Sequence, residues 1–257
     1  MIEEFEFMSE RIDDIGFGNL RLIQDTDGFC YGVDAVLLAD FAATNKVPPQ
    51  KEDVLAVDLG TGTGIIPLIL SHKTVWKKIV GIEVQEGSFT RAVSTARLNG
   101  LEDRIEYYNI DVKDVNWKYE HLIGKAEVVT CNPPYVKRSG GLINTNNSKA
   151  IARHETTAEL GDFIGCAKDL LKPGGHLFMV HRPSRLVDIC FLGRKIGMEP
   201  KEIRMVSPKK DQEPNILLVH MVKGGGTEMK ILKEISVYDD EENYTEDILA
   251  CYEGKEL

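Results

Sequence analysis

The 257-residue chain is 42% hydrophobic, which suits one large α/β domain with a sizeable core, or such a domain with a small appendage. No apolar run reaches the roughly 18 residues that span a bilayer, and the first residues are acidic where a signal peptide is basic, so we expect a cytoplasmic protein with no membrane partner. The net charge of −10 argues at first sight against nucleic acid as a partner. The five cysteines are scattered and never in Cys-x-x-Cys spacing, which argues against a disulfide framework or a metal site.

The start of the chain predicts a small β-hairpin followed by a segment at the rim of a cofactor pocket. Two short stretches, 11–15 and 20–23, flank a glycine-containing turn, which is the pattern of a hairpin. Residues 33–41 then fit an amphipathic helix with Asp34 in its first turn, where a carboxylate also suits the helix dipole. We expect Tyr31 and Asp34 to line the cofactor pocket.

The next segment predicts a nucleotide-binding βα unit. A β-branched apolar strand, 54–58, runs into a loop with Gly60, Gly62 and Gly64, and a helix follows. A dinucleotide fingerprint, Gly-x-Gly-x-x-Gly, would need a third glycine where the chain has Ile65. The alternating glycines resemble instead the S-adenosylmethionine loop of Rossmann-like methyltransferases.

Carboxylates at the ends of successive strands are candidates for holding that cofactor. S-adenosylmethionine carries a sulfonium, an ammonium and a carboxylate but no phosphate, so nearby acidic residues favour its binding. Asp58, at the end of the first strand, is placed for the amino-acid end of the cofactor. Glu83 ends the second strand, where a carboxylate grips ribose hydroxyls. Asp111 follows the third strand, 105–110, and is a candidate acceptor for the adenine, with Asp114 as the nearby alternative.

A fourth apolar strand, 128–131, runs directly into the tetrapeptide Asn132, Pro133, Pro134 and Tyr135. Two consecutive prolines cannot donate ladder hydrogen bonds, so the backbone leaves the sheet in a rigid turn. Such a turn would hold the Asn132 amide, the Pro133 carbonyl and the Tyr135 ring in one geometry. Two acceptors beside one aromatic ring suit a flat molecule with an NH2 group, so we expect these four residues to form a catalytic turn; an ordinary strand-ending turn is the alternative.

The second half of the chain predicts a helix, a strand, a second helix and two further strands, and these last two strands form an antiparallel hairpin that closes a mixed sheet. The first helix is expected at residues 160–171, the second helix from 182–185 to about 196, and the strands at 176–181, 200–206 and 216–222. The residues after 223 are acidic, and we expect no catalytic role for them. The predicted division is an N-terminal segment at 1–32, a main domain at 33–223 and an acidic extension at 224–257.

Four segments together resemble the bacterial tRNA(Val) adenosine N6-methyltransferases, which modify position 37 beside the anticodon. They are residues 29–39, the Asn-Pro-Pro-Tyr turn, residues 152–155 and residues 181–186. The resemblance covers most of residues 10–223. One departure is the pair Tyr31-Gly32, where the family pattern has an aromatic residue followed by serine.

The resemblance implies an α/β fold of the Rossmann-like class I type, with a seven-stranded mixed sheet whose last strand is antiparallel, plus a small N-terminal β-hairpin. It also implies S-adenosylmethionine as the cofactor and the anticodon loop of a tRNA as the substrate. The reaction would be transfer of the methyl group to an adenine N6. Asn132 would then border both the cofactor and the acceptor base.

Charge is unevenly distributed along the chain. Residues 130–223 contain 15 lysines and arginines against 9 acidic residues, whereas the rest contains 16 against 32. The segment that begins at the predicted catalytic turn is thus basic within an acidic protein, which favours RNA binding there, although surface cations also serve solubility alone. The candidate substrate-binding residues are Lys137, Arg138, Arg153, Arg182 and Arg185.

Three alternative functions share some of these features. The same turn occurs in protein-glutamine N5-methyltransferases, whose substrate also presents a flat amide NH2, and in DNA adenine N6-methyltransferases. A non-catalytic module that binds RNA or S-adenosylmethionine is the alternative from another class. An intact turn and a complete glycine loop argue against that module, and no obligate protein partner is expected.

Overall fold

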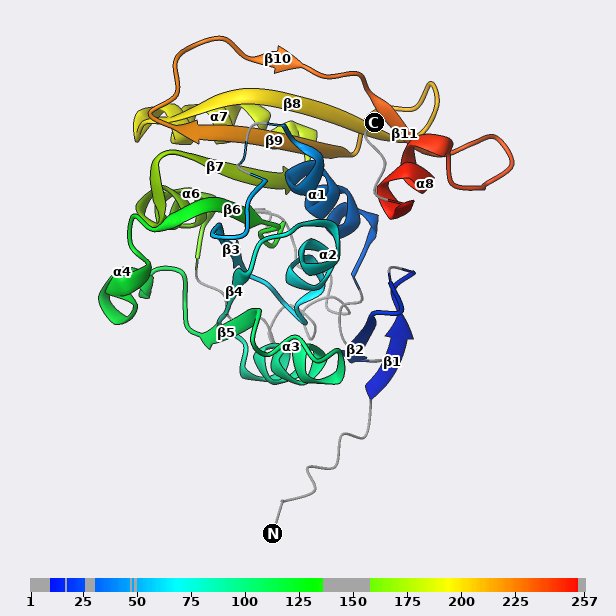
Figure 1. Cartoon of the computed structure of the whole chain (residues 1–257). Helices are drawn as coiled ribbons and strands as arrows, with labels where there is room; N and C mark the ends of the chain where they lie inside the picture. Colours follow the sequence, from blue (N-terminus) through cyan, green and yellow to red (C-terminus); the bar gives the residue numbers. More distant parts are fainter. Residues whose placement is uncertain are drawn as a thin grey trace, which may run out of the picture.

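The computed structural model describes residues 10–16, 18–25, 31–46, 48, 50–135 and 158–253. Its main feature is a nine-stranded sheet in the order β10-β8-β9-β7-β6-β3-β4-β5, with β11 also paired to β8 (Figure 1). These strands are β3 (Leu55–Leu59), β4 (Lys78–Glu83), β5 (Ile105–Asn109), β6 (Ala126–Cys131), β7 (Leu171–His181), β8 (Met198–Lys209), β9 (Ile216–Lys223), β10 (Lys230–Ile231) and β11 (Ile235–Tyr238).

The sheet confirms the predicted mixed architecture. β9 runs antiparallel to both β7 and β8, and the other pairings are parallel. The central strands β3, β4 and β6 are buried along nearly their whole length, as parallel strands covered on both faces require. Their near-continuous apolar sequences therefore follow from their place in the middle of the sheet.

Helices cover both faces of the sheet. The apolar side chains of α1, α2, α3 and α8 join one core cluster, and those of α4, α6 and α7 join the other. Alternate residues of β3 point to opposite clusters, Ala56 to the first and Val57 to the second. The helices are α1 (Val33–Thr44), α2 (Ile65–Lys73), α3 (Glu86–Leu98), α4 (Val115–Lys118), α6 (Leu160–Leu170), α7 (Leu186–Lys195) and α8 (Glu246–Glu253), with single turns η1 (Glu120–Leu122) and η2 (Pro183–Arg185).

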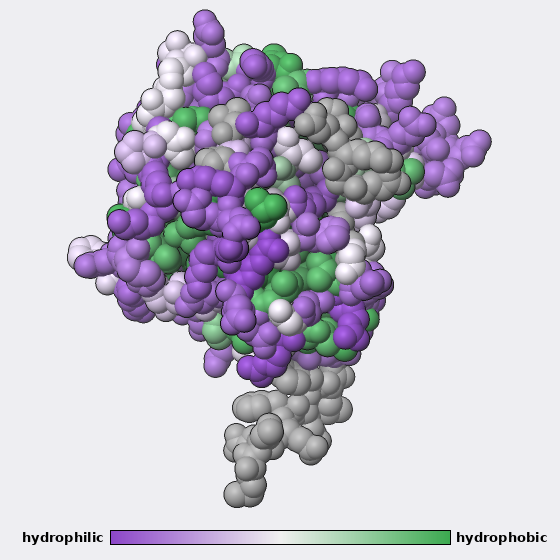
Figure 2. Space-filling view, viewed as in Figure 1, coloured by the Kyte–Doolittle hydropathy of each residue, from purple (hydrophilic) through white to green (hydrophobic). Residues whose placement is uncertain are grey.

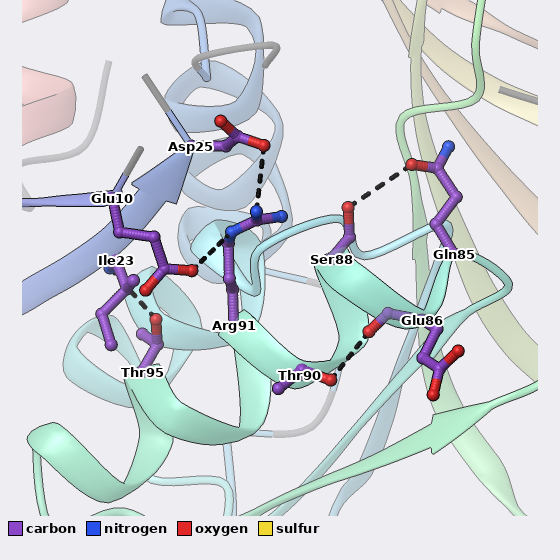
Figure 3. A network of polar contacts seen from close by, with 9 residues as sticks. All are labelled: Glu10, Ile23, Asp25, Gln85, Glu86, Ser88, Thr90, Arg91 and Thr95. Carbon is purple, nitrogen blue, oxygen red and sulfur yellow. Dashed lines mark hydrogen bonds and ion pairs between the residues drawn. The ribbon is translucent and has the colours of Figure 1, made fainter. Parts of the chain in front are cut away.

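The predicted N-terminal hairpin is present and is fastened to α3. It consists of β1 (Glu10–Asp14) and β2 (Arg21–Asp25). The Arg91 guanidinium on α3 bonds to Glu10 at 2.8 Å and to Asp25 at 2.9 Å, so one cation joins both strands (Figure 3). The Ile23 N–H donates to the Thr95 hydroxyl at 3.2 Å, which ties the hairpin to the next turn of the same helix (Figure 3).

The C-terminal segment adds two strands and a helix that the sequence did not predict. β10 and β11 lie beside β8 at the edge of the sheet, and α8 lies next to α1 (Figure 1). Ile235, Val237 and Ile248 are almost completely buried in the α1 cluster. The segment therefore packs as part of the main core, although its overall composition is acidic.

The exterior is mostly polar on the face seen in Figure 2, with only small, separate hydrophobic areas. None of the helices in the described residues has the length and apolar character needed to cross a membrane.

Candidate active site

The loop after β3 has the backbone shape that its glycines predict. The Gly60 N–H donates to the Ile82 carbonyl at 2.9 Å, which holds the loop against the end of β4. Gly62 and Gly64 have positive φ angles, and a Cβ at position 64 would lie 2.4 Å from the Tyr107 hydroxyl. A Cβ at Gly62 would meet no atom within 4 Å, so this part of the loop is open to a ligand.

Asp58 lies at the end of β3 with its side chain fully buried. The Thr130 hydroxyl on the neighbouring strand β6 donates to Asp58 Oδ1 at 2.7 Å. In the described part of the chain, Asp58 Oδ2 and the hydroxyls of Thr61 and Tyr107 have no hydrogen-bond partner of acceptable geometry. Burial raises the pKa of Asp58 to about 7 despite the Thr130 hydrogen bond. Because buried polar atoms without partners are rare, this group has the character of a polar ligand site.

Glu83 ends β4 beside the same loop and is also buried. Its Oε2 accepts the Gly62 N–H and its Oε1 accepts the Gln85 N–H, both at 2.8 Å. These two bonds fix the plane of the carboxylate beside the loop. The sheet register sets Asp58 opposite Gly81 on β4 and Thr130 on β6, so the three strands end at one edge.

The turn after β6 is joined to the first turn of α1 by Asp34. Asn132 Nδ2 donates to Asp34 Oδ2 at 3.4 Å, and the Tyr135 hydroxyl lies 3.2 Å from both Asp34 Oδ2 and Asn132 Oδ1. A carboxylate accepts hydrogen bonds only, so Asp34 sets which end of the Asn132 amide faces it. The hydroxyl has one proton, and the charged carboxylate is the stronger acceptor. Asn132 Oδ1 is therefore left available to another donor.

The Tyr135 ring is backed by the end of β7. The His181 ring lies 4.9 Å from it between centroids, and the Arg182 guanidinium carbon lies 5.3 Å from its centroid. The Arg182 N–H donates to His181 Nδ1 at 2.7 Å, and burial together with Arg185 and Arg182 lowers the pKa of His181 to about 4. Burial and the Asp34 carboxylate raise the pKa of Tyr135. Both rings are therefore neutral near pH 7.

The prolines of the turn differ in exposure. Pro133 is buried and Pro134 is exposed, so the chain turns out of the sheet between them. β6 ends at Cys131, immediately before Asn132, as the sequence predicted. This placement puts the turn beside the Asp58 strand, because β6 pairs with β3 up to Cys131.

Tyr31 is not joined to this group. Its N–H donates to Gln24 Oε1 at 3.2 Å, and burial together with Asp13 and Tyr244 raises its pKa. Among the described residues it forms no hydrogen bond or ring contact with the turn at Asn132. Its predicted role at the cofactor rim stays a prediction.

Asp111 follows β5 and belongs to a short turn. Its Oδ1 accepts the Lys113 N–H at 3.0 Å, and its Oδ2 lies 3.5 Å from the Lys113 ammonium. Asp114, the alternative, precedes α4 and donates its N–H to the Asp111 carbonyl at 2.9 Å. The adenine contact of either residue stays a prediction.

The predicted substrate residues divide into two sets. Arg182 lies over the Tyr135 ring just before η2, and Arg185 ends η2, immediately before α7. Lys137, Arg138 and Arg153 lie outside the described residues.

Sequence reasoning did not single out Thr130 or His181. Thr130 is one residue of an apolar strand, and its bond to Asp58 depends on the register between β3 and β6. His181 carried a recognisable signal, because it is a polar residue at the carboxyl end of a buried strand, where ligands bind in such sheets.

Comparisons with known proteins bear on this site. A family model described as RNA methyltransferase matches residues 35–185. A tRNA1(Val) (adenine(37)-N6)-methyltransferase of Porphyromonas gingivalis is 30% identical over 192 residues, covering 73% of this chain and 72% of the relative. The chain belongs to this RNA methyltransferase family. A second relative of the same name, from Glaesserella parasuis, is 25% identical over 248 residues, and the match covers 90% of this chain and 92% of that relative.

Solved structures share the fold of this family member. A predicted O-methyltransferase from Agrobacterium tumefaciens has a TM-score of 0.67 at 18% identity and covers 86% of this chain and 96% of its own. P. horikoshii TYW2, solved in complex with MeSAdo, has a TM-score of 0.57 at 17% identity and covers 84% of this chain and 72% of its own. These likenesses confirm the Rossmann-like methyltransferase fold.

Proposed function

We propose that this chain is an S-adenosylmethionine-dependent methyltransferase of the cytoplasm that methylates the N6 atom of an adenosine in tRNA, at position 37 in the anticodon loop of a valine tRNA. Membership of the family, at 30% identity to a tRNA1(Val) (adenine(37)-N6)-methyltransferase, carries this proposal. The arrangement of Asp34, Asn132 and Tyr135 at the carboxyl edge of the sheet supports the chemistry.

The chemistry of the crevice fits the cofactor. Asp58 Oδ2 is a buried acceptor without a partner, which suits the ammonium of S-adenosylmethionine. Glu83 lies at the end of β4 beside the loop, where a carboxylate can accept from ribose hydroxyls, and the open side of Gly62 leaves room for close approach of the ligand to the backbone. When bound there, S-adenosylmethionine would supply a methyl group activated by its sulfonium.

The turn at 132–135 would hold the acceptor base. The N6 amine of adenine has two N–H bonds, and Asn132 Oδ1 and the Pro133 carbonyl are the two acceptors assigned to them. These acceptors favour a more tetrahedral nitrogen, whose lone pair is then less delocalised into the ring and more nucleophilic. The Tyr135 ring would fix the plane of the base, supported from behind by His181 and Arg182.

Asp34 would act as a positioning residue for this turn. It takes one N–H of the Asn132 amide and the Tyr135 hydroxyl proton, so Asn132 Oδ1 is directed to the amine. An anticodon-loop base suits the site because it leaves its stack at lower cost than a base in a duplex.

The test of this function is a methyl-transfer assay with purified protein and tritiated S-adenosylmethionine. The acceptors are tRNA from a strain lacking this gene, unmethylated DNA, and a release factor as the protein-glutamine substrate. We expect label in tRNA alone, and nuclease digestion should recover it as N6-methyladenosine. Label in DNA or in the release factor alone, or on another atom of tRNA, would contradict the proposal.

A further inference from the structure

The outer surface of α7 carries a stripe of exposed side chains that the fold does not need. Val187 is 77% exposed and Phe191 is 64% exposed, and Lys195 follows at the same four-residue spacing. Residues four apart lie one above another on a helix, so these three side chains form one row along α7. We call this row the α7 stripe.

The opposite side of α7 packs tightly on the sheet. Ile189 is completely buried, and a Cβ added at Gly193 would lie 2.3 Å from Met221 Cε on β9. The helix therefore cannot turn to bury Val187 and Phe191, because that would remove Ile189 from the core and force Gly193 away from the sheet. Their exposure is a property of the fold, and an exposed phenylalanine beside a valine marks a contact surface.

The α7 stripe follows closely in sequence on the residues that back the catalytic turn. α7 follows β7 through η2, and Arg182, the residue just before η2, lies over the Tyr135 ring. Phe191 is five residues along the helix from Leu186, which is about 7.5 Å along the axis at 1.5 Å per residue. The stripe therefore runs away from the turn along α7, in the direction that further nucleotides of a bound RNA loop could follow.

The charges around the stripe favour a polyanion. Arg182 and Lys195 stand at its two ends, and neither forms an ion pair with any residue that the structure describes. Arg185 and Arg194 flank it, paired with Asp188 at 2.7 Å and with Glu199 at 3.1 Å. An aromatic ring between unpaired cations is the usual composition of a surface that stacks bases and neutralises phosphates.

We infer that the α7 stripe is a second contact surface for the RNA substrate, where Phe191 stacks on an unpaired base and Lys195 and Arg182 meet phosphates on either side. This inference rests on the proposed function for the identity of the RNA. It extends the contact beyond Arg182 and Arg185 to residues outside the segment 35–185 that the family model matches.

Self-association through α7 fits the same observations less well. A two-fold interface places the same patch on both copies, so the cations around the stripe would face one another. Two exposed apolar side chains are also far from the roughly 1,000 Å² that a stable interface buries. RNA satisfies both the ring and the charges.

The experiment measures binding of fluorescently labelled unmodified tRNA to the full-length protein, together with methyl transfer. The variants are Phe191→Ala and Lys195→Ala, and the matched control is Trp117→Ala, which removes an 82% exposed aromatic ring from α4, on another part of the surface. Phe191→Ala should weaken tRNA binding roughly tenfold, as expected for one lost base stack, and raise the tRNA KM similarly. Lys195→Ala should flatten the salt dependence of binding. S-adenosylmethionine affinity, thermal unfolding and turnover at saturating tRNA should not change.

The outcomes separate this inference from the proposed function. If the wild-type protein binds tRNA and Phe191→Ala or Lys195→Ala binds it equally well, the inference is wrong even where methyl transfer confirms the function. If Phe191→Ala weakens tRNA binding but the wild-type protein transfers no methyl group, the surface stands and the function is wrong. No tRNA binding by the wild type, an equal effect of Trp117→Ala, or a dimer that Phe191→Ala converts to monomer would each overturn the inference.

Discussion

Two groups of buried polar side chains lie on the same face of the sheet and differ in whether their atoms have partners. At the carboxyl edge, Asp58 Oδ2 and the Thr61 and Tyr107 hydroxyls lack partners among the described residues. Nearer the β10 edge, His176, His220 and Glu202 form a chain of contacts, His176 Nδ1 to His220 Nε2 at 3.0 Å and His220 Nδ1 to Glu202 at 3.3 Å. We call the second group the histidine cluster.

The histidine cluster is complete without a ligand. Asn45, just after α1, donates to Glu202 at 2.7 Å, and the His220 ring stacks on Phe178 with centroids 4.5 Å apart and planes 6° apart. Its hydrogen bonds join α1 to β7, β8 and β9, so it stabilises the packing of that helix. The comparison shows that burial of a polar residue does not by itself mark a functional site. The stronger indication is that Asp58, Thr61 and Tyr107 gather three unpartnered polar atoms beside the glycine loop.

The largest effect is expected at the catalytic turn. Asn132→Ala should lower turnover roughly 100-fold or more, as for loss of one oriented polar contact in a transition state, and leave the affinity for S-adenosylmethionine nearly unchanged. Single-turnover assays and calorimetry measure the two quantities. Full activity in this variant would remove the turn from the mechanism.

The histidine cluster should show the opposite response. His220→Ala leaves His176 Nδ1 without its partner, removes one hydrogen bond to Glu202 and opens a cavity against Phe178, so it should lower the free energy of unfolding by about 2 kcal/mol or more. Urea denaturation measures this change. The same variant should keep the wild-type kcat and cofactor affinity. A lower kcat with an unchanged free energy of unfolding would contradict a structural role for the histidine cluster.

Asp34→Asn tests the positioning of the turn. An amide offers both a donor and an acceptor, so it no longer dictates the orientation of Asn132, and we expect turnover to fall about tenfold, less than for Asn132→Ala. The double variant Asp34→Asn with Asn132→Ala serves as the control. It should be no slower than Asn132→Ala alone, because Asp34 acts through Asn132; additive losses would show that Asp34 acts independently.

Acidification should act on the two groups with opposite sign. Burial and His176 lower the pKa of His220 to about 4. Between about pH 6.5 and 4 the unfolded chain therefore takes up a proton that the folded chain does not, and the free energy of unfolding decreases as the pH decreases. The pKa of Asp58 is raised to about 7, so between about pH 4 and 7 the folded chain holds the extra proton and stability rises as pH falls.

Each of these groups contributes at most about 1.4 kcal/mol per pH unit. Relative to the wild type, the denaturation midpoints at pH 7, 6 and 5 should therefore shift upward toward acid in His220→Gln, where the Asp58 effect is unopposed, and fall more steeply toward acid in Asp58→Asn. Identical slopes in all three proteins would contradict the assignment.

The sequence predicted the parts of this molecule that depend on local pattern. The glycine loop, the buried strands β3, β4 and β6 and the two prolines after Asn132 each have a local signature that specifies their geometry. β10, β11 and α8 escaped prediction because their apolar residues are few, and only pairing with β8 and packing on α1 bury them.

The site was predicted as a set of residues and not as a set of contacts. Asp34 was expected at the cofactor rim, but its bonds to Asn132 and Tyr135 span about a hundred residues of sequence and depend on how α1 lies over the end of β6. The partner of Asp58 likewise depends on strand register. Such long-range contacts have no local signature.

The most direct test of whether Asp58 serves the cofactor and the histidine cluster serves stability is calorimetric titration of S-adenosylmethionine into the wild type, Asp58→Asn and His220→Gln. The free energy of unfolding is measured for each protein. Asn at position 58 still accepts the Thr130 hydroxyl but offers the cofactor no carboxylate, so its affinity should fall roughly tenfold or more while stability at pH 7 is kept or increased. His220→Gln should lose stability and keep its affinity. Equal cofactor affinity in Asp58→Asn and the wild type would contradict the assignment of the unpartnered Asp58 oxygen to the cofactor.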